Sequence, residues 1–331
     1  SRYPDGGSNY LSSSLYVGYK QDVNSKSTLN SGIRFTNTNL NATWIDETFI
    51  QLSENDISAN NSAITATLGY VYKPNKNWQL NSVLSSGFRS PNIDDVGRVR
   101  EKSGDVTVPN INVKPEFAYN AEVGIQKYFN NRKFRLSANV FYTLLDNYII
   151  RDRFTINGSD QVLFDGEYGN AVANQNRGNA FITGYTISYL GKLSNAWNTS
   201  GFITYTKGRT YDSEEPMSSI PPLFGQFEVN YKRDKIEVGA ALRFNSKKDI
   251  EDFNFTEGID NHDLTPVVDA NAANNEDIYF GTPSWMTIGV NGRYSVTENF
   301  SVQARLDNLF DEHYIEFASG ISSPGRNLSV S

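Results

Sequence analysis

Hydrophobic and polar residues alternate with a period of two along most of the chain. Between Phe134 and Leu144, every second residue is apolar or aromatic, and most residues between them are polar. Because successive side chains of a β-strand point to opposite faces of a sheet, this period predicts strands with one apolar and one polar face. We predict thirteen strands, near residues 11–19, 28–37, 64–73, 78–90, 116–128, 133–151, 178–192, 197–210, 223–232, 235–248, 284–295, 299–310 and 325–331.

The connections between these strands alternate between short and long. The short ones cover residues 21–27, 74–77, 129–132, 193–196, 233–234 and 296–298. The long ones cover residues 38–63, 91–115, 152–177, 211–222, 249–283 and 311–324. An antiparallel meander gives this alternation when one end of every hairpin is tight, as in outer-membrane β-barrels with short periplasmic turns and long extracellular loops. The fold class predicted is therefore an all-β, antiparallel, up-and-down transmembrane β-barrel.

Aromatic residues gather beside the short connections. They are Tyr72, Trp78, Phe129, Phe134, Trp197, Tyr231, Tyr294 and Phe300, and most fall in the apolar phase of their strand. A ring of outward aromatic side chains at one level is typical of the girdle at a membrane interface. The alternative is that they pack the hairpin ends of a soluble sheet.

Charged and amide side chains occupy the polar phase in the middle of the strands. They are Glu122, Asn139, Glu228, Glu237, Arg243, Arg293 and Arg305. Each would be costly if buried singly in a sandwich core. We expect them to face a wide, wet or plugged lumen, which only a large barrel provides.

Composition excludes several function classes. The chain has 331 residues, no Cys and two His, His262 and His313, so a disulfide framework and a cysteine nucleophile are excluded and a multi-histidine metal site is disfavoured. Its net charge of −7 argues against nucleic acid as a partner. Mean hydropathy is −0.50, and no apolar run approaches the ~18 residues of a membrane helix, a criterion that barrel strands escape.

Enzymatic activity and a resident cofactor are not expected. The adjacent carboxylates Asp94 and Asp95 lie in a predicted loop, as do Glu214 and Glu215. Neighbours in an extended chain point to opposite sides, which suits a two-carboxylate mechanism poorly. No sequence typical of a nucleophile elbow is present.

Four segments, in order along the chain, resemble motifs of the TonB-dependent outer-membrane receptors of Gram-negative bacteria. The segments are RYPDGG at residues 2–7, GFRSPNIDD at 87–95 with PNINVKPE at 109–116, IPPLFG at 220–225, and DNLFDEHY at 307–314 with PGRN at 324–327. The resemblance covers the whole chain. It implies a 22-stranded barrel around an N-terminal plug, with uptake powered by the TonB complex and contact with outer-membrane lipids and lipopolysaccharide.

The resemblance also implies that the chain is a C-terminal part of such a barrel. Thirteen strands are fewer than 22, and an odd number cannot close an antiparallel barrel in regular alternation. The plug and TonB box would precede Ser1, and the chain stops at Ser331 without the terminal aromatic residue usual in the family. We therefore expect residues 1–331 to form an open arc without a plug, which does not transport by itself.

The family takes up ferric siderophores, haem, cobalamin or glycans. Haem-type members carry a His between the two motifs that flank residues 92–112, whereas this chain has Arg98, Arg100 and Lys102 there. These cations would suit an anionic ferric chelate, so a ferric siderophore is the first expectation, with haem or cobalamin next. The alternative is a solvated run of loop charges.

Other loop residues are weaker candidates. Trp44, Phe253, Phe255 and Tyr279 are aromatic residues that either stack on a ligand or pack the loops together. The acidic segment 249–277, with Asp260, His262 and Asp263, offers oxygen and imidazole ligands for a divalent ion, but a flexible acidic surface is the simpler interpretation. His313 we interpret as structural.

Three rival classes stay open from sequence. A passive porin-like channel would lack a plug, which the residues upstream would show. A barrel protease or lipase would need a Ser/His or Asp/His site, for which two histidines leave little room. A soluble β-rich adhesin would refold without detergent.

Overall fold

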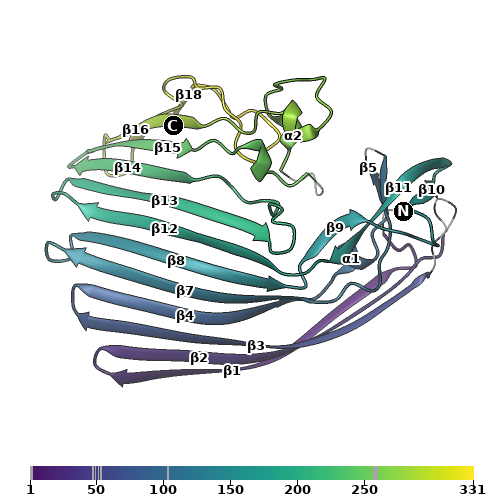
Figure 1. The fold of residues 1–331 in the computed structure, drawn as a ribbon. Helices are drawn as coiled ribbons and strands as arrows, with labels where there is room; N and C mark the ends of the chain where they lie inside the picture. The colour runs from purple at the N-terminus through teal and green to yellow at the C-terminus, as the bar shows by residue number, and fades with distance from the viewer. Residues whose placement is uncertain are drawn as a thin grey trace.

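A computed structural model describes residues 3–46, 48, 50, 52, 54–102, 104–255 and 260–331. Thirteen antiparallel strands form one sheet in chain order, which confirms the predicted meander (Figure 1). They are β1 (Ser8–Asn24), β2 (Ser27–Thr43), β3 (Asp56–Asn75), β4 (Trp78–Arg89), β7 (Glu116–Phe129), β8 (Phe134–Asp146), β12 (Ala180–Lys192), β13 (Trp197–Thr210), β14 (Phe224–Arg233), β15 (Ile236–Asn245), β16 (Trp285–Ser295), β17 (Ser301–Asp307) and β18 (Asn327–Val330). The strands β1 and β18 stand at the two ends of this order, and among the described residues they do not pair with each other. The sheet is therefore an open arc.

The strand registers give the sheet one apolar and one polar face. Across β7, β8 and β12, Val123 pairs with Val140 and Val140 with Tyr185, so apolar side chains form rows on one face. The opposite face carries all seven polar mid-strand residues predicted from sequence, and there Asn139 donates to the Glu122 carboxylate at 2.5 Å. The apolar rows are exposed, and Val123, for example, is 61% exposed. A soluble protein rarely exposes aligned rows of apolar side chains.

The two ends of the strands differ as the loop lengths predicted. Tight turns lie at one end of the sheet, and the long connections gather at the other (Figure 1). At the tight end, the Trp197 and Tyr231 rings pack with centroids 4.9 Å apart on the apolar face. The strand registers place Tyr72, Trp78, Phe129, Phe134 and Tyr294 on the same face. Every helix in the described part of the chain is too short or too polar to cross a membrane.

Two long connections fold into a second, five-stranded sheet that the period-two pattern did not reveal. Its strands are β5 (Arg100–Lys102), β6 (Asp105–Thr107), β9 (Ile149–Arg153), β10 (Gln161–Phe164) and β11 (Glu167–Asn176). The short helix α1 (Ile93–Val96) precedes β5 in the same connection. The predicted strand 133–151 divides into β8 and β9 because Asn147 adopts a left-handed φ of 56° that interrupts the extended chain. Four of these strands have only three to five residues, too few to show alternation, and the ten residues of β11 do not alternate regularly between apolar and polar.

The small sheet shares a hydrophobic core with the loop ends of β2 and β3. Val96, Val106 and Ala171 from the loops pack with Leu40 of β2 and Ile57 of β3 in one buried cluster. Leu40 follows Arg34 and Thr36 in the polar phase of β2, so the loops fold over the polar face of the large sheet. The remaining short helices, η1 (Ile250–Asp252), η2 (His262–Leu264) and α2 (Asn275–Ile278), lie in the long connection before β16.

Candidate functional site

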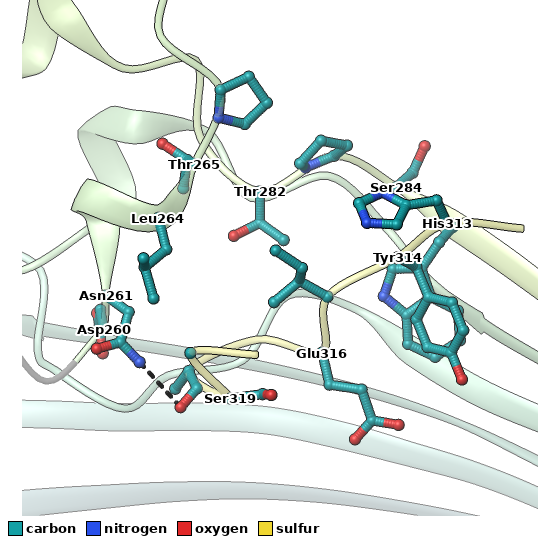
Figure 2. Close-up of a pocket in the computed structure, with 16 residues that line it drawn as sticks. Asp260, Asn261, Leu264, Thr265, Thr282, Ser284, His313, Tyr314, Glu316 and Ser319 are labelled. Atoms are coloured by element: carbon teal, nitrogen blue, oxygen red, sulfur yellow. Dashed lines mark hydrogen bonds between the residues drawn. The ribbon is translucent and has the colours of Figure 1, made fainter. Parts of the chain in front are cut away.

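Two long loops, residues 249–283 and 311–324, enclose a pocket beside the start of β16. Its volume is about 290 Å³, and Figure 2 shows Asp260, Thr282, His313, Tyr314 and Glu316 around it. Trp285 is the first residue of β16. The centroids of its ring and of the Tyr314 ring lie 4.4 Å apart, and the two ring planes are tilted by 36°. The tilted pair forms an aromatic wall of the pocket, and the half-buried Trp285 is the more accessible of the two rings because Tyr314 is only 9% exposed.

Two hydrogen-bond donors at the start of β16 have no partner among the described residues. They are Nε1 of Trp285, which lines the pocket, and Nδ2 of Asn245, which pairs in register with Trp285 from β15. Asn245 is 7% exposed, so water reaches its side chain poorly. A buried donor without a partner costs about 1–3 kcal/mol, which an acceptor oxygen of a ligand or another segment would recover.

A charged pair lies next to this donor pair. Nη2 of Arg243, on the polar face of β15, is 2.8 Å from the Glu316 carboxylate, and its guanidinium lies 5.7 Å from the Trp285 ring. Both side chains are about half exposed, so the pair contributes little to stability. It therefore leaves the guanidinium accessible to an anionic group at the pocket.

A buried ion pair joins the loops around the pocket. Nζ of Lys248 is 3.3 Å from Oδ2 of Asp260, with side chains that are 4% and 0% exposed. The Asp260 carboxylate also accepts the backbone N–H of Ser219 at 2.6 Å, and the Lys248 ammonium donates to the Ile220 carbonyl at 2.8 Å. Two loops, 211–222 and 249–283, are thus tied at one charged centre.

Aromatic rings connect the third loop to the same centre. The Lys248 ammonium lies 4.8 Å from the ring of Phe253 and 4.2 Å from the ring of Phe317, in the loop 311–324. Burial lowers the pKa of Lys248, while Asp260 opposes that shift. We call Lys248, Asp260, Phe253 and Phe317 the loop clamp. It holds three loops together beside the pocket.

His262 occupies an aromatic cage near the clamp. Its ring centroid is 4.7 Å from that of Phe255 and 5.5 Å from that of Tyr279, both in edge contact. Its Nδ1 is buried without a partner among the described residues. Burial lowers the pKa of His262, and the charges of Asp263 and Asp260 act in the opposite direction. The neutral imidazole is therefore the form that the cage favours.

The aromatic candidates predicted from sequence have different surroundings. Trp44 is 4% exposed in the core of the five-stranded sheet, and Phe253 is fully buried in the loop clamp. A ring must be accessible to stack on a ligand, so in this structure these two pack the loops. Phe255 and Tyr279 hold His262.

The predicted cations lie apart from this pocket in the chain's other loop cluster. Arg100 and Lys102 are exposed on β5, an edge strand of the five-stranded sheet. Arg98 precedes them and lies 3.8 Å from the Asp94 carboxylate. The structure therefore does not bring these three cations to the pocket that contains Trp285 and Tyr314.

The acidic segment does not assemble a metal site in the part of the chain that the structure describes. That part contains no group of three or more His, Asp and Glu side chains placed to hold an ion. Asp260 already has Lys248 as its cation, and Asp263 is exposed. Glu257 of the same segment lies outside the described residues.

Two residues of the pocket and the neighbouring Asn245 were missed from sequence. Asn245, Trp285 and Tyr314 sit at strand ends and inside the NLFDEHY motif, where the alternating pattern gives no sign of a site. From sequence, only this motif and the IPPLFG segment, which begins at Ile220 directly after Ser219, indicated this region of the chain.

A family model described as TonB dependent receptor-like, beta-barrel matches residues 1–309. Among curated proteins, the chain is 26% identical over 277 residues to the hemoglobin and hemoglobin-haptoglobin-binding protein A of Haemophilus influenzae, covering 79% of this chain and 24% of that protein. It is 23% identical over 325 residues to hemoglobin-binding protein A of the same species, covering 84% and 29%. The chain thus spans less than a third of the length of these relatives.

Solved structures with the same fold include a copper transporter and a siderophore receptor. The copper transporter OprC superposes with a TM-score of 0.76 at 17% identity, over 97% of this chain and 47% of that one. The siderophore receptor PiuA from Acinetobacter baumannii gives 0.69 at 18% identity, over 98% and 43%. Likeness at this level of identity shows the shared barrel fold.

The loop clamp predicts unequal roles for two adjacent lysines. Lys248→Met leaves the Asp260 carboxylate buried and unpaired, so we expect it to cost about 3–5 kcal/mol and to open the three loops. Lys247→Met removes an exposed pair with Asp249 and an ammonium contact with the Phe280 ring, and should cost no more than about 1 kcal/mol. Amide hydrogen exchange in residues 249–283 and 311–324 measures the difference. Equal exchange in the two variants would contradict the clamp.

The His262 cage predicts a pH dependence. Because the folded-state pKa lies below the ordinary value of about 6.5, the unfolded loop binds the proton more readily. The stability contribution is complete above about pH 6.5 and is lost as the pH falls through the lowered pKa. The protection factors of amides in residues 260–281, which are exchange rates corrected for the intrinsic effect of pH, should therefore fall as the pH is lowered from about 7.5 to about 5. His262→Phe, which keeps an aromatic ring, should reduce this pH dependence; an unchanged dependence would rule His262 out as its source.

Proposed function

The chain belongs to the TonB-dependent receptor family, and we propose that it forms part of an outer-membrane receptor that takes up an iron chelate, a ferric siderophore in the first instance. In this proposal the apolar face contacts lipid and the polar face lines the lumen. The tight turns lie in the periplasm and the long loops outside the cell. The exposed rows of apolar side chains support that placement, because lipid would cover them.

The pocket at the start of β16 carries the proposal for ligand binding. Its tilted pair of rings, Trp285 and Tyr314, offers an aromatic wall to a conjugated group, and the unpartnered N–H of Trp285 suits an acceptor oxygen. The Arg243 guanidinium beside Trp285 is paired with the pocket-lining Glu316, so it becomes a donor for an anionic group that displaces this carboxylate. Ferric chelates present anionic oxygen ligands to their surroundings, so this combination of stacking and donation matches their chemistry.

Haem is a second candidate. The two curated relatives are named for binding hemoglobin, and His313 lines the pocket with its Nε2 3.2 Å from the Ser322 hydroxyl. An imidazole beside a flat aromatic wall suits an iron porphyrin. A passive channel, the alternative considered from sequence, gains no support from the family match or from loops that fold over the polar face.

Coupling to the TonB complex belongs to the same proposal. The resemblance implies that a plug domain closes the barrel and presents the TonB-binding segment, and residues 1–331 would then supply later strands of the wall. Gene deletion tests the function as a whole. We expect loss of growth on one ferric siderophore, or on haem, as the sole iron source; normal growth on all of them would contradict iron uptake.

Replacement of Trp285 tests the pocket. Trp285→Ala removes the stacking surface and one N–H donor, so we expect the affinity for the ferric siderophore or haem identified by growth to fall about tenfold or more. Trp285→Phe should keep most of the stacking and lose the donor. Trp197→Ala, on the apolar face at the opposite end of the sheet, is the matched control. Binding by the purified receptor measures the effect, and an affinity unchanged in Trp285→Ala would exclude this pocket.

A further inference from the structure

The segments DNLFDEHY and PGRN lie at the two ends of the loop 311–324, which forms one side of the pocket. Residues 313–316 and 318–320 of this loop line the pocket (Figure 2). The loop contains no helix and one isolated β-bridge, between Ile315 and Ser322. Its conformation therefore depends on contacts at its ends and at its tip, where Phe317 joins the loop clamp.

Asn308 connects the two ends of the loop. It directly follows β17 and is attached to the large sheet, because the N–H of the next residue, Leu309, donates to the Ile288 carbonyl of β16 at 2.8 Å. The Asn308 amide nitrogen donates to the carbonyls of Glu312 at 2.8 Å and Pro324 at 3.3 Å. Its amide oxygen accepts the N–H of Glu312 at 2.9 Å. Asn308 is 5% exposed, so water competes poorly for these bonds.

Asp311 makes a second connection between the same ends. Its carboxylate accepts the backbone N–H of Arg326 at 2.7 Å, and Nη2 of Arg326 lies 3.8 Å from the second carboxylate oxygen. Gly325 leaves room for this carboxylate, since a Cβ atom there would lie 2.8 Å from it. Asn308 and Asp311 have left-handed φ angles of 50° and 60°, which Asn and Asp adopt more readily than other non-glycine residues. We call Asn308, Asp311 and Arg326 the base latch.

The base latch holds the part of the loop that meets Trp285. Just inside it, the N–H of Ser323 donates to the Tyr314 carbonyl at 2.8 Å, and the Ser322 hydroxyl lies 3.2 Å from Nε2 of His313. These bonds keep Tyr314 beside Trp285. A loop that is already ordered in the free protein does not have to be ordered by the ligand, and this raises affinity.

We propose that Asn308 and Asp311 are positioning residues for the ligand pocket. They do not line it. They hold the loop 311–324 in the arrangement that binds, and so set the affinity for the ligand. This inference rests on the proposed uptake function, and it gives the DNLFDEHY and PGRN segments a role in ligand binding. A role in folding alone would instead lower the amount of folded receptor and leave its affinity unchanged.

Equilibrium binding by the purified full-length receptor tests this role, with haemin, a ferric catecholate and a ferric hydroxamate as probes. Asn308→Gly removes the amide and keeps the backbone conformation accessible, because glycine adopts positive φ freely. Asn131→Gly is the matched control, since Asn131 is exposed and has a φ of 53° in the tight turn between β7 and β8. For each probe that the wild type binds, we expect Asn308→Gly to bind about tenfold more weakly and Asn131→Gly to bind equally well.

Two further variants separate positioning from a general loss of stability. Gly325→Ala places a Cβ atom against the Asp311 carboxylate, displaces it from the Arg326 N–H and should also weaken binding. In a Trp285→Ala background, Asn308→Gly should weaken binding less than it does in the wild type, because both changes act through one pocket. Amide hydrogen exchange in Asn308→Gly should rise in residues 312–324 and stay unchanged in β7 and β8.

Wild-type affinity in both Asn308→Gly and Gly325→Ala would overturn the proposal, and so would an equal effect of Asn308→Gly with and without the Trp285 ring. Fewer folded receptors, measured by the mobility of unheated samples in electrophoresis, with unchanged affinity would assign the base latch to folding alone. A wild-type receptor that binds none of the three probes would instead contradict the proposed uptake function, and this inference with it.

Discussion

The fold depends on pairing every strand of a long meander with its neighbours while keeping two chemically different faces. Lipid offers no hydrogen-bond partners, so a membrane-spanning strand must satisfy its backbone groups within the sheet. The registers do this in chain order from β1 to β18, and the period of two then separates Val123 and Val140 from Asn139. The aromatic row beside the tight turns is defined relative to a face of this sheet, and the short and long connections relative to its two ends. The proposed orientation in the membrane depends on both.

The long connections form two groups, and a different interaction holds each group in place. The connections that form the small sheet share a hydrophobic core with β2 and β3, so their position over the polar face is fixed by buried apolar area. The loops around Trp285 depend instead on one ion pair, Lys248 with Asp260, that is satisfied by backbone groups and aromatic rings. A charged centre of this kind is stable only when complete, which makes the second loop group the one more readily opened. The pocket lies in that second group.

Sequence predicted the large sheet well because alternation is a local property of the chain. It could not predict the clamp, since Lys247 and Lys248 are adjacent and chemically identical, yet one is exposed and the other is buried against Asp260. The same limit applies to Trp44 and Trp285. Both stand near strand ends, but tertiary packing buries the first in the loop core and places the second on the pocket wall. The cations Arg98, Arg100 and Lys102 were grouped by position in sequence, and the fold separates that group from the pocket.

The central claim is that one face of the sheet contacts lipid, and spin-label accessibility along β8 measures this most directly. The chain has no cysteine, so single-cysteine variants from Leu136 to Tyr142 each carry one label at a known position. In lipid bilayers, we expect labels at Leu136, Ala138 and Val140 to be relaxed mainly by oxygen, and labels at Ser137 and Asn139 mainly by a water-soluble nickel chelate. Uniform access of the nickel chelate to all these positions, with no period of two, would contradict the membrane placement.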